Sequence, residues 1–164
     1  MPTININKYT SIYHNDVINL ILSIQQKEFN IPITLEDQPD LQEIEAFFQY
    51  GNGNFWVATI DNKIIGTISL VDIGNQQVAL RKMFVQENYR GKAFGIGQAL
   101  LHTVFEWTKV KRLTDIFLGT TEKYLAAHRF YEKNGFTEIE KVDLPKAFPI
   151  MQVDTRFYQY TTGE

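Results

Sequence analysis

The sequence of 164 residues contains no cysteine. This absence excludes a disulfide framework, a thiolate metal site and a cysteine nucleophile. No apolar run reaches the roughly 20 residues that span a bilayer, and the chain does not open with the basic and apolar regions of a signal peptide. The three histidines form no cluster, so no metal site is indicated. We expect a cytoplasmic protein without a metal and without a membrane contact.

The chain also has little excess charge of either sign. Its net charge of −3 provides no overall basic field that would hold DNA or RNA. The hydrophobic fraction of 44% and the charged fraction of 21% are ordinary for a globular protein, and the length suits a single core. We therefore expect one domain, residues 3–160, with no nucleic-acid partner. A monomer and a homodimer both remain open.

Residues 90–101 form a basic, glycine-rich stretch, which is the most informative motif of the sequence. A strand-like run, residues 78–85, precedes it, and apolar residues at helical spacing follow it. A loop between a strand and a helix exposes backbone N–H groups at the helix N-terminus, where the helix dipole favours negative charge. Arg90 and Lys92 add two positive charges. This combination predicts a binding site for a phosphate or a pyrophosphate.

Two common phosphate-binding motifs do not match this loop. A P-loop ends in Gly-Lys-Ser/Thr, which does not occur here. The dinucleotide motif GxGxxG needs a third glycine where Leu100 stands, together with an acidic residue after the next strand. The phosphate site therefore belongs to another class.

The loop resembles the pyrophosphate loop of the GNAT-type N-acetyltransferases, which reads Gln/Arg-x-x-Gly-x-Gly/Ala and holds coenzyme A. Two registers fit this pattern. One runs from Lys92 through Gly95 to Gly97, with lysine in the first place, and the other runs from Arg90 to Gly95.

A second motif strengthens the resemblance. The sequence from Ala127 to Phe136 is similar to the family pattern of Ala followed by Phe/Leu-Tyr-Glu-Lys-x-Gly-Phe. The two motifs occur in the order and at the separation that the family shows. The resemblance covers roughly residues 3–160 and is strongest over residues 80–136.

The resemblance implies an α/β fold, in which a mixed, mostly antiparallel sheet is flanked by helices and splays between two central parallel strands. It also implies an enzyme that moves an acetyl group from acetyl-CoA to a primary amine of a small molecule or peptide, by direct attack in a ternary complex. A non-catalytic module of the same fold that binds or senses CoA is the alternative. A third hypothesis is an interaction domain that keeps the fold but no longer binds CoA.

The same resemblance assigns roles to individual residues. Tyr131 matches the general acid that protonates the departing thiolate. Tyr124 stands seven residues earlier, where many relatives carry an asparagine that bonds the pantetheine arm or a phosphate oxygen, and its phenol can still donate a hydrogen bond. The residues assigned to the cofactor are Met83, Phe84, Val85, Arg90, Gly91, Lys92, Ala93, Phe94, Gly95, Ile96, Gly97, Gln98, Tyr124, Ala127 and Tyr131.

The base that would remove a proton from the amine is not evident. Relatives often place a glutamate on the strand that enters the glycine loop, but residues 77–85 contain no carboxylate. Glu28, Glu122, His128 and a water relay are the alternatives.

That strand instead carries two adjacent cations, Arg81 and Lys82. Because side chains alternate along a strand, one of the two is expected to face the ligand. A cation there would favour an amine that also carries a carboxylate and would repel a polyamine. A solvated pair at a strand edge is the alternative.

The remaining elements follow from periodicity and turn residues. Asn15 or Asp16 is expected to cap a helix that reaches Phe29, and Asp40 to cap a helix that reaches Phe48. The other expected elements are a strand at 3–8, hairpin strands at 55–60 and 63–71 joined by Asp61-Asn62, a buried strand at 116–119 parallel to the strand before the glycine loop, a helix at 122–133 and a closing strand at 155–160.

Overall fold

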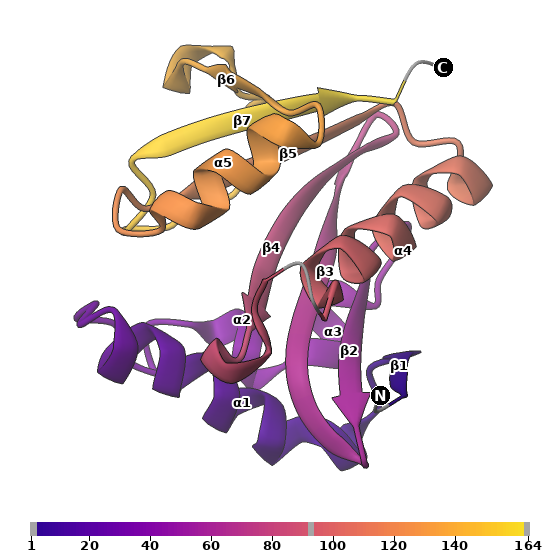
Figure 1. Cartoon of the computed structure of the whole chain (residues 1–164). Coiled ribbons are helices and arrows are strands. Elements are labelled where there is room, and N and C mark those ends of the chain that lie inside the picture. The colour runs from indigo at the N-terminus through magenta and orange to yellow at the C-terminus, as the bar shows by residue number, and fades with distance from the viewer. Residues whose placement is uncertain (1–2, 92–93, 163–164) are drawn as a thin grey trace.

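The computed structural model describes residues 3–91 and 94–162 of the chain. Within these ranges the strands form one seven-stranded sheet in the order β1-β2-β3-β4-β5-β7-β6 (Figure 1). The strands are β1 (Ile4–Lys8), β2 (Asn54–Ile60), β3 (Lys63–Gly74), β4 (Gln77–Val85), β5 (Asp115–Thr120), β6 (Thr137–Ile139) and β7 (Arg156–Thr161).

Helices and short helical turns connect these strands. The helices are α1 (His14–Leu22), the π-helix η2 (Ser23–Glu28), α2 (Pro39–Gln42), α3 (Ile44–Phe48), α4 (Ile96–Lys111) and α5 (Leu125–Lys133). The 3-10 turns are η1 (Ser11–Tyr13), η3 (Glu87–Tyr89) and η4 (Lys141–Asp143). No helix in the described part of the chain is long and apolar enough to cross a membrane.

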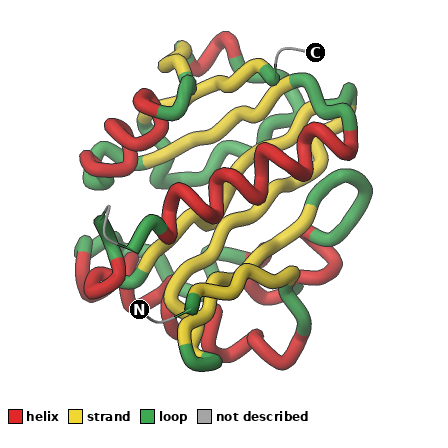
Figure 2. The backbone as a smooth tube through the Cα atoms, turned by 45° about the vertical axis from the view of Figure 1, so that its right-hand side comes forward, coloured by secondary structure: helices red, strands yellow, loops and turns green. Residues whose placement is uncertain are grey.

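Helices cover both faces of the sheet. The long helix α4 crosses one face, where Leu100 and Val104 pack in a core with Trp56 of β2 (Figure 2). A second core cluster joins Val17 of α1 to Phe55 of β2. Adjacent residues of β2 therefore enter opposite layers, as the pleat of a strand requires. This α/β arrangement confirms the expected fold class.

The neighbouring strands β4 and β5 run parallel, whereas the other neighbours in the sheet are antiparallel. The β4–β5 pairing extends only from Gln77 with Asp115 to Ala79 with Phe117. Beyond this point both strands continue, and they separate visibly (Figure 1). The expected splay between two central parallel strands is therefore confirmed.

The N-terminal helices begin and end differently from the expectation. A 3-10 turn leads into α1 at His14, so neither Asn15 nor Asp16 caps this helix. The helix then widens into η2 instead of continuing as a regular α-helix. The next expected helix is divided into α2 and α3 at Glu43, whose backbone is non-helical with φ −132°. Asp40 lies inside α2, so its predicted role as a cap is wrong.

The C-terminal elements also show two differences. The helix expected from residue 122 begins as α5 only at Leu125, and Tyr124 occupies its N-cap position. Strand β6 was not predicted, because three residues show no clear alternation. The expected hairpin turn is confirmed, since Asp61 and Asn62 have the positive φ values, 51° and 64°, that a two-residue hairpin favours.

A β-bulge interrupts β4 where it begins to leave β5. The pairing with β3 shifts by one residue between Ser69 opposite Arg81 and Thr67 opposite Phe84. Lys82 in the bulge adopts a left-handed conformation, φ 54°, which is uncommon for a residue other than glycine. Hydroxyl groups of β3 satisfy the displaced carbonyls, because Thr67 Oγ1 donates to Lys82 O and Ser69 Oγ donates to Arg81 O, both at 2.6 Å.

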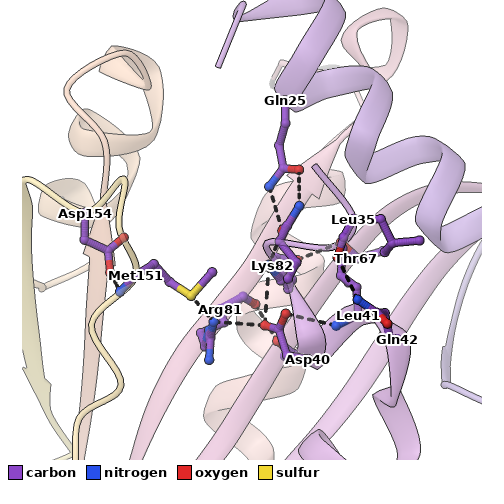
Figure 3. Close-up of polar contacts among 12 residues, drawn as sticks. Gln25, Leu35, Asp40, Leu41, Gln42, Thr67, Arg81, Lys82, Met151 and Asp154 are labelled. Atoms are coloured by element: carbon purple, nitrogen blue, oxygen red, sulfur yellow. Dashed lines mark hydrogen bonds and ion pairs between the residues drawn. The ribbon is translucent and has the colours of Figure 1, made fainter. Parts of the chain in front are cut away.

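The bulge brings both cations of β4 against the N-terminal segment (Figure 3). The Asp40 carboxylate is 2.9 Å from Arg81 Nη2 and 3.4 Å from Lys82 Nζ, and all three side chains are less than 10% exposed. Lys82 Nζ also donates to Gln38 Oε1, whose amide exchanges hydrogen bonds with Gln25. The alternative of a solvated pair at a strand edge is therefore wrong.

Burial in this cluster lowers the pKa of Lys82 from 10.5 to about 8, against the opposing effect of Asp40. The unfolded chain therefore keeps this proton between pH 8 and 10.5, whereas the folded chain loses it. The free energy of unfolding should rise with pH across this window, because the cost of burying the charge disappears.

We predict that wild-type protein gains stability relative to Lys82→Gln between pH 7.5 and 10, by up to about 3 kcal/mol at 1.36 kcal/mol per pKa unit. Urea unfolding at several pH values measures this difference. Lys63→Gln, at an exposed position of the hairpin, controls for the loss of one positive charge. Parallel pH profiles for wild type and Lys82→Gln would contradict the prediction.

Candidate active site

A cavity of about 720 Å³ opens where β4 and β5 diverge. Its walls are residues 80–85 of β4, residues 119–121 at the end of β5, the glycine loop and one side of α5. The N-terminal segment contributes Phe29 and Ile31, and the segment before β7 contributes Met151 and Asp154. The two sequence motifs and the bulge thus surround a single cavity.

The glycine loop reaches the cavity from the N-terminus of α4. Gly91 and Gly95 have positive φ values of 102° and 63°, and Gly95 is the N-cap of α4. Gly97 lies in the first turn, where an added Cβ would meet Met83 and Phe130 at an ordinary 3.7 Å. The first N–H groups of a helix have no partner within it, so they are available to an anion.

The structure sorts the residues assigned to the cofactor into three groups. Phe94 packs against the core and Ile96 is fully buried in it, and neither is among the described residues that line the cavity. Lys92 and Ala93 lie outside the described residues. The others line the cavity: Met83, Phe84, Val85, Arg90, Gly91, Gly95, Gly97, Gln98, Tyr124, Ala127 and Tyr131.

Arg90 is held in place before the loop. Its Nε donates to Val85 O at 2.8 Å, and its guanidinium forms a two-point ion pair with Glu28 and lies 5.7 Å from the centre of the Phe29 ring. Glu28 is therefore engaged by an arginine, and it is not among the described residues that line the cavity. This arrangement argues against Glu28 as a free base.

Tyr131 is the buried tyrosine of α5, only 6% exposed, and it lines the cavity. Burial, with smaller effects from Tyr124 and Tyr158, raises its pKa well above the usual value of 10. The phenol consequently stays protonated at neutral pH. A protonated group beside the cavity is the state that a general acid requires.

Tyr124 closes the cavity toward the N-terminal segment. Its ring meets Phe29 edge-on at 4.8 Å and Phe84 edge-on at 6.1 Å. Burial, followed by the nearby Glu28, raises its pKa, so its hydroxyl also remains a donor at neutral pH. Lys123 strengthens this closure because its Nζ donates to Phe29 O and to Asn30 O, at 3.4 and 3.2 Å.

The other two candidate bases do not reach the cavity. His128 is 3% exposed, and Nδ1 accepts from Arg156 at 2.8 Å while Nε2 faces Thr121 O at 2.9 Å. Because arginine can only donate, this geometry fixes the proton on Nε2 and leaves no free lone pair. Glu122 is exposed and is not among the described residues that line the cavity.

Asp154 is a cavity residue that the sequence did not indicate. It is the only carboxylate among the described residues that line the cavity. Its Oδ2 accepts from Met151 N at 2.8 Å. Burial raises its pKa, an effect that the Met151 hydrogen bond, Arg81 and Lys82 partly offset. No motif surrounds Asp154, so only the folded chain connects it with the rest of the site.

Among the charged side chains of the described cavity wall, cations outnumber carboxylates. The cations among the described lining residues are Arg81, Lys82, Arg90, Lys123, Arg129 and Lys133. Arg129 and Lys133 are exposed on α5, whereas Arg81 and Lys82 are buried at the bulge. No group of His, Asp and Glu side chains in the described part of the chain is arranged to hold a metal ion. The cavity is thus suited to an anionic ligand.

Known proteins share this architecture over the whole chain. An acetyltransferase of the GNAT family from Staphylococcus aureus Mu50 has 43% sequence identity and a TM-score of 0.94, with 98% of this chain and 99% of that chain covered. An N-acetyltransferase from Thermoplasma acidophilum, solved in complex with coenzyme A, has the same fold at 20% identity, with a TM-score of 0.73 and coverage of 97% and 99%.

A curated relative matches part of the chain. The N-acetylaspartate synthetase of Xenopus tropicalis is 38% identical over 108 residues, which are 63% of this chain and 38% of that protein. This chain therefore matches little more than a third of the relative's length.

The family model for the acetyltransferase (GNAT) domain matches residues 51–138, more than half of the chain and both motifs at the cavity. With the fold, the splayed strands and the similarity to the Staphylococcus aureus protein, this match shows that the chain belongs to the GNAT acetyltransferase family.

Proposed function

We propose that the protein transfers an acetyl group from acetyl-CoA to a primary amine that also carries a carboxylate. The main support is that Tyr131, the glycine loop and the bulge of β4 all line one cavity at the divergence of β4 and β5. Family membership supports the acetyl transfer. The relative named for N-acetylaspartate supports an acceptor of the amino-acid type.

The residues of the cavity fit coenzyme A. Its pyrophosphate would meet the N-terminus of α4, where Gly95 and Gly97 leave the backbone accessible, and Arg90, which is paired with Glu28, lies at the same end of the cavity. Its pantetheine arm would lie between the diverging strands, where residues 83–85 can offer backbone groups that no longer pair with β5. The exposed cations of α5, Arg129 and Lys133, suit the remaining phosphate.

The reaction needs the amine nitrogen to attack the thioester carbonyl and the sulfur to leave. Backbone N–H groups near the bulge would stabilise the negative charge that develops on the carbonyl oxygen. Tyr131 would protonate the departing thiolate, because its phenol is protonated at neutral pH and lines the same cavity. Direct attack would take place in a complex that holds both acetyl-CoA and the amine, so it needs no acetylated enzyme residue.

The buried cluster at the bulge supports an anionic acceptor. Among the described contacts Arg81 and Lys82 form ion pairs only with Asp40, and the nearby Asp154 carboxylate pairs with neither. A carboxylate of the acceptor would give these two cations a second ion-pair partner. The thioether of Met151 contacts Arg81, and an unbranched methionine side chain can adopt several conformations to admit a substrate.

We predict that Gly97→Val weakens acetyl-CoA binding at least tenfold, because the larger side chain fills the space where the ligand must approach the backbone. The structure accepts a Cβ at this position without a clash, so the domain should still fold. Calorimetry measures the dissociation constant. Ala99→Val, in the same helix but outside the cavity lining, is the control, and equal affinities for both variants would reject the assignment of the loop.

We predict that wild-type protein acetylates aspartate or glutamate at least tenfold more efficiently, in kcat/KM, than amines without a carboxylate. Arg81→Gln should lower kcat/KM for the carboxylated acceptors by roughly 10- to 150-fold, the value of a hydrogen bond to a charged group of about 1.5–3 kcal/mol. Acceptors without a carboxylate serve as the internal control. A strong preference for spermidine would eliminate the proposed acceptor class.

We predict that Tyr131→Phe lowers kcat by ~10²–10⁴-fold and leaves the affinity for acetyl-CoA nearly unchanged, because the proton is needed only as the thioester breaks. Steady-state kinetics and calorimetry on one preparation test both statements. Tyr158→Phe is the matched control, since it removes a neighbouring hydroxyl that bonds Glu132 and lies outside the cavity lining. A kcat within about threefold of wild type would remove Tyr131 from the mechanism.

A further inference from the structure

The proposed transfer requires a proton acceptor for the amine. An alkylamine with a pKa near ~10 is almost wholly protonated at neutral pH and cannot attack a carbonyl in that form. The three bases considered from the sequence are engaged by arginine or lie outside the cavity lining in the described part of the chain. Asp154 is the carboxylate that the described cavity wall contains.

The position of Asp154 is fixed by the segment around it. Its Oδ2 accepts from Met151 N at 2.8 Å, and Asp154 N donates to Met151 O at 3.0 Å, which closes a tight turn. The next residue, Thr155, donates its N–H to Thr120 O at the end of β5, at 2.9 Å. The turn is therefore attached to the strand that forms one wall of the cavity.

A glycine in β5 makes room for this carboxylate. A Cβ added to Gly119 would lie 2.6 Å from Asp154 Oδ2 and 2.7 Å from its Cγ, distances that real side chains do not tolerate. The carboxyl group thus lies directly on the backbone of β5. This is the strand whose separation from β4 opens the cavity.

Asp154 also faces the cations of β4. Met151, in the same turn, contacts Arg81 through its sulfur, and Arg81 in turn pairs with Asp40 (Figure 3). Arg81 and Lys82 are close enough to lower the pKa of Asp154, but neither forms an ion pair with it among the described contacts. Asp154 is therefore free to receive another positive group, such as the ammonium of an acceptor.

Lys82 is less suitable as the base. Its pKa is lowered by burial to about 8, so it still carries a proton at neutral pH. It acts there as a cation and a donor. An acceptor with one ammonium and one carboxylate would therefore direct its carboxylate toward Arg81 and Lys82 and its ammonium toward Asp154.

We propose that Asp154 is the general base of the transfer, an inference that rests on the function proposed above. The Asp154 carboxylate takes one proton from the ammonium, and the free amine then forms the new N–C bond as the C–S bond breaks. Tyr131 gives its proton to the thiolate, and the second proton of the nitrogen restores Tyr131. The proton on Asp154 passes to solvent, so each turnover releases one proton, one amide and one thiol.

The variant Asp154→Asn tests this role, because the amide keeps the size and the hydrogen bond from Met151 N. At pH 7 its kcat/KM for the carboxylated acceptor should be ~10²–10⁴-fold below wild type. The deficit in kcat/KM should shrink about tenfold per pH unit up to the pKa of the amine. The variant depends on amine that is already neutral in solution, and this fraction rises tenfold per pH unit, whereas wild-type protein can deprotonate the bound ammonium itself. The Asp154 carboxylate also raises the pKa of Lys82, so the variant loses the Lys82 proton at a lower pH than wild type. The slope is therefore measured below pH 8, the approximate pKa of Lys82 in wild type.

A purely structural role would give a deficit that does not change with pH. Melting temperature and the dissociation constant of acetyl-CoA establish that Asp154→Asn is folded and binds the cofactor. Glu106→Gln removes an exposed carboxylate on α4 and controls for the change in charge. Gly119→Ala, which would push the carboxylate off β5, should produce the same pH-dependent deficit.

The outcomes separate the two proposals. If wild-type protein releases no CoA with any amine, the transfer function is wrong and Asp154 has no role as its base. If wild-type protein transfers acetyl groups, two results would show that only the assignment of Asp154 is wrong. One is a kcat/KM of Asp154→Asn within about threefold of the wild-type value, and the other is a deficit in kcat/KM that stays constant across pH.

Discussion

The site depends on the point where β4 and β5 cease to pair. Parallel strands normally continue their ladder, and buried backbone groups without partners are costly. Here the ladder ends at Ala79 and Phe117, although both strands go on. The β3 hydroxyls of Thr67 and Ser69 satisfy two carbonyls at the bulge of β4. What remains is a cavity with polar backbone along one wall and a helix N-terminus at its mouth, which an extended ligand with phosphates can fill.

The bulge also links the two halves of the site. Because Lys82 adopts a left-handed conformation, the alternation of side chains fails, and both Lys82 and Arg81 reach Asp40 of the N-terminal segment. A buried ion pair contributes little net stability by itself, since desolvation offsets the attraction. Its value here is positional. It holds α2 against β4 and places two cations beside the point where β4 separates from β5.

The sequence predicted most of the architecture because its signals are local. The glycine loop between a strand and a helix, the hairpin at Asp61-Asn62 and the motif around Tyr131 each depend on residues close together in the chain. The errors have the opposite origin. The left-handed Lys82, the burial of Asp40 and the place of Asp154 over Gly119 all arise from tertiary contacts between distant segments. No spacing in the sequence encodes such contacts. The sequence could place Arg81 and Lys82 beside the ligand, but their pairing with Asp40 and the position of Asp154 are evident only in the folded chain.

Burial shifts the pKa in the same direction for the two groups that we propose as acid and base, but with different consequences. Removing water disfavours the charged form of any acid, so it raises the pKa of Tyr131 and of Asp154 alike. For the phenol, the shift secures the proton until a thiolate forms. For the carboxylate, it increases the affinity for a proton, while Arg81 and Lys82 limit the shift and favour the ionised state at neutral pH. One cavity can therefore carry both the proposed acid and the proposed base, because the two groups start from different intrinsic pKa values and have different charged neighbours.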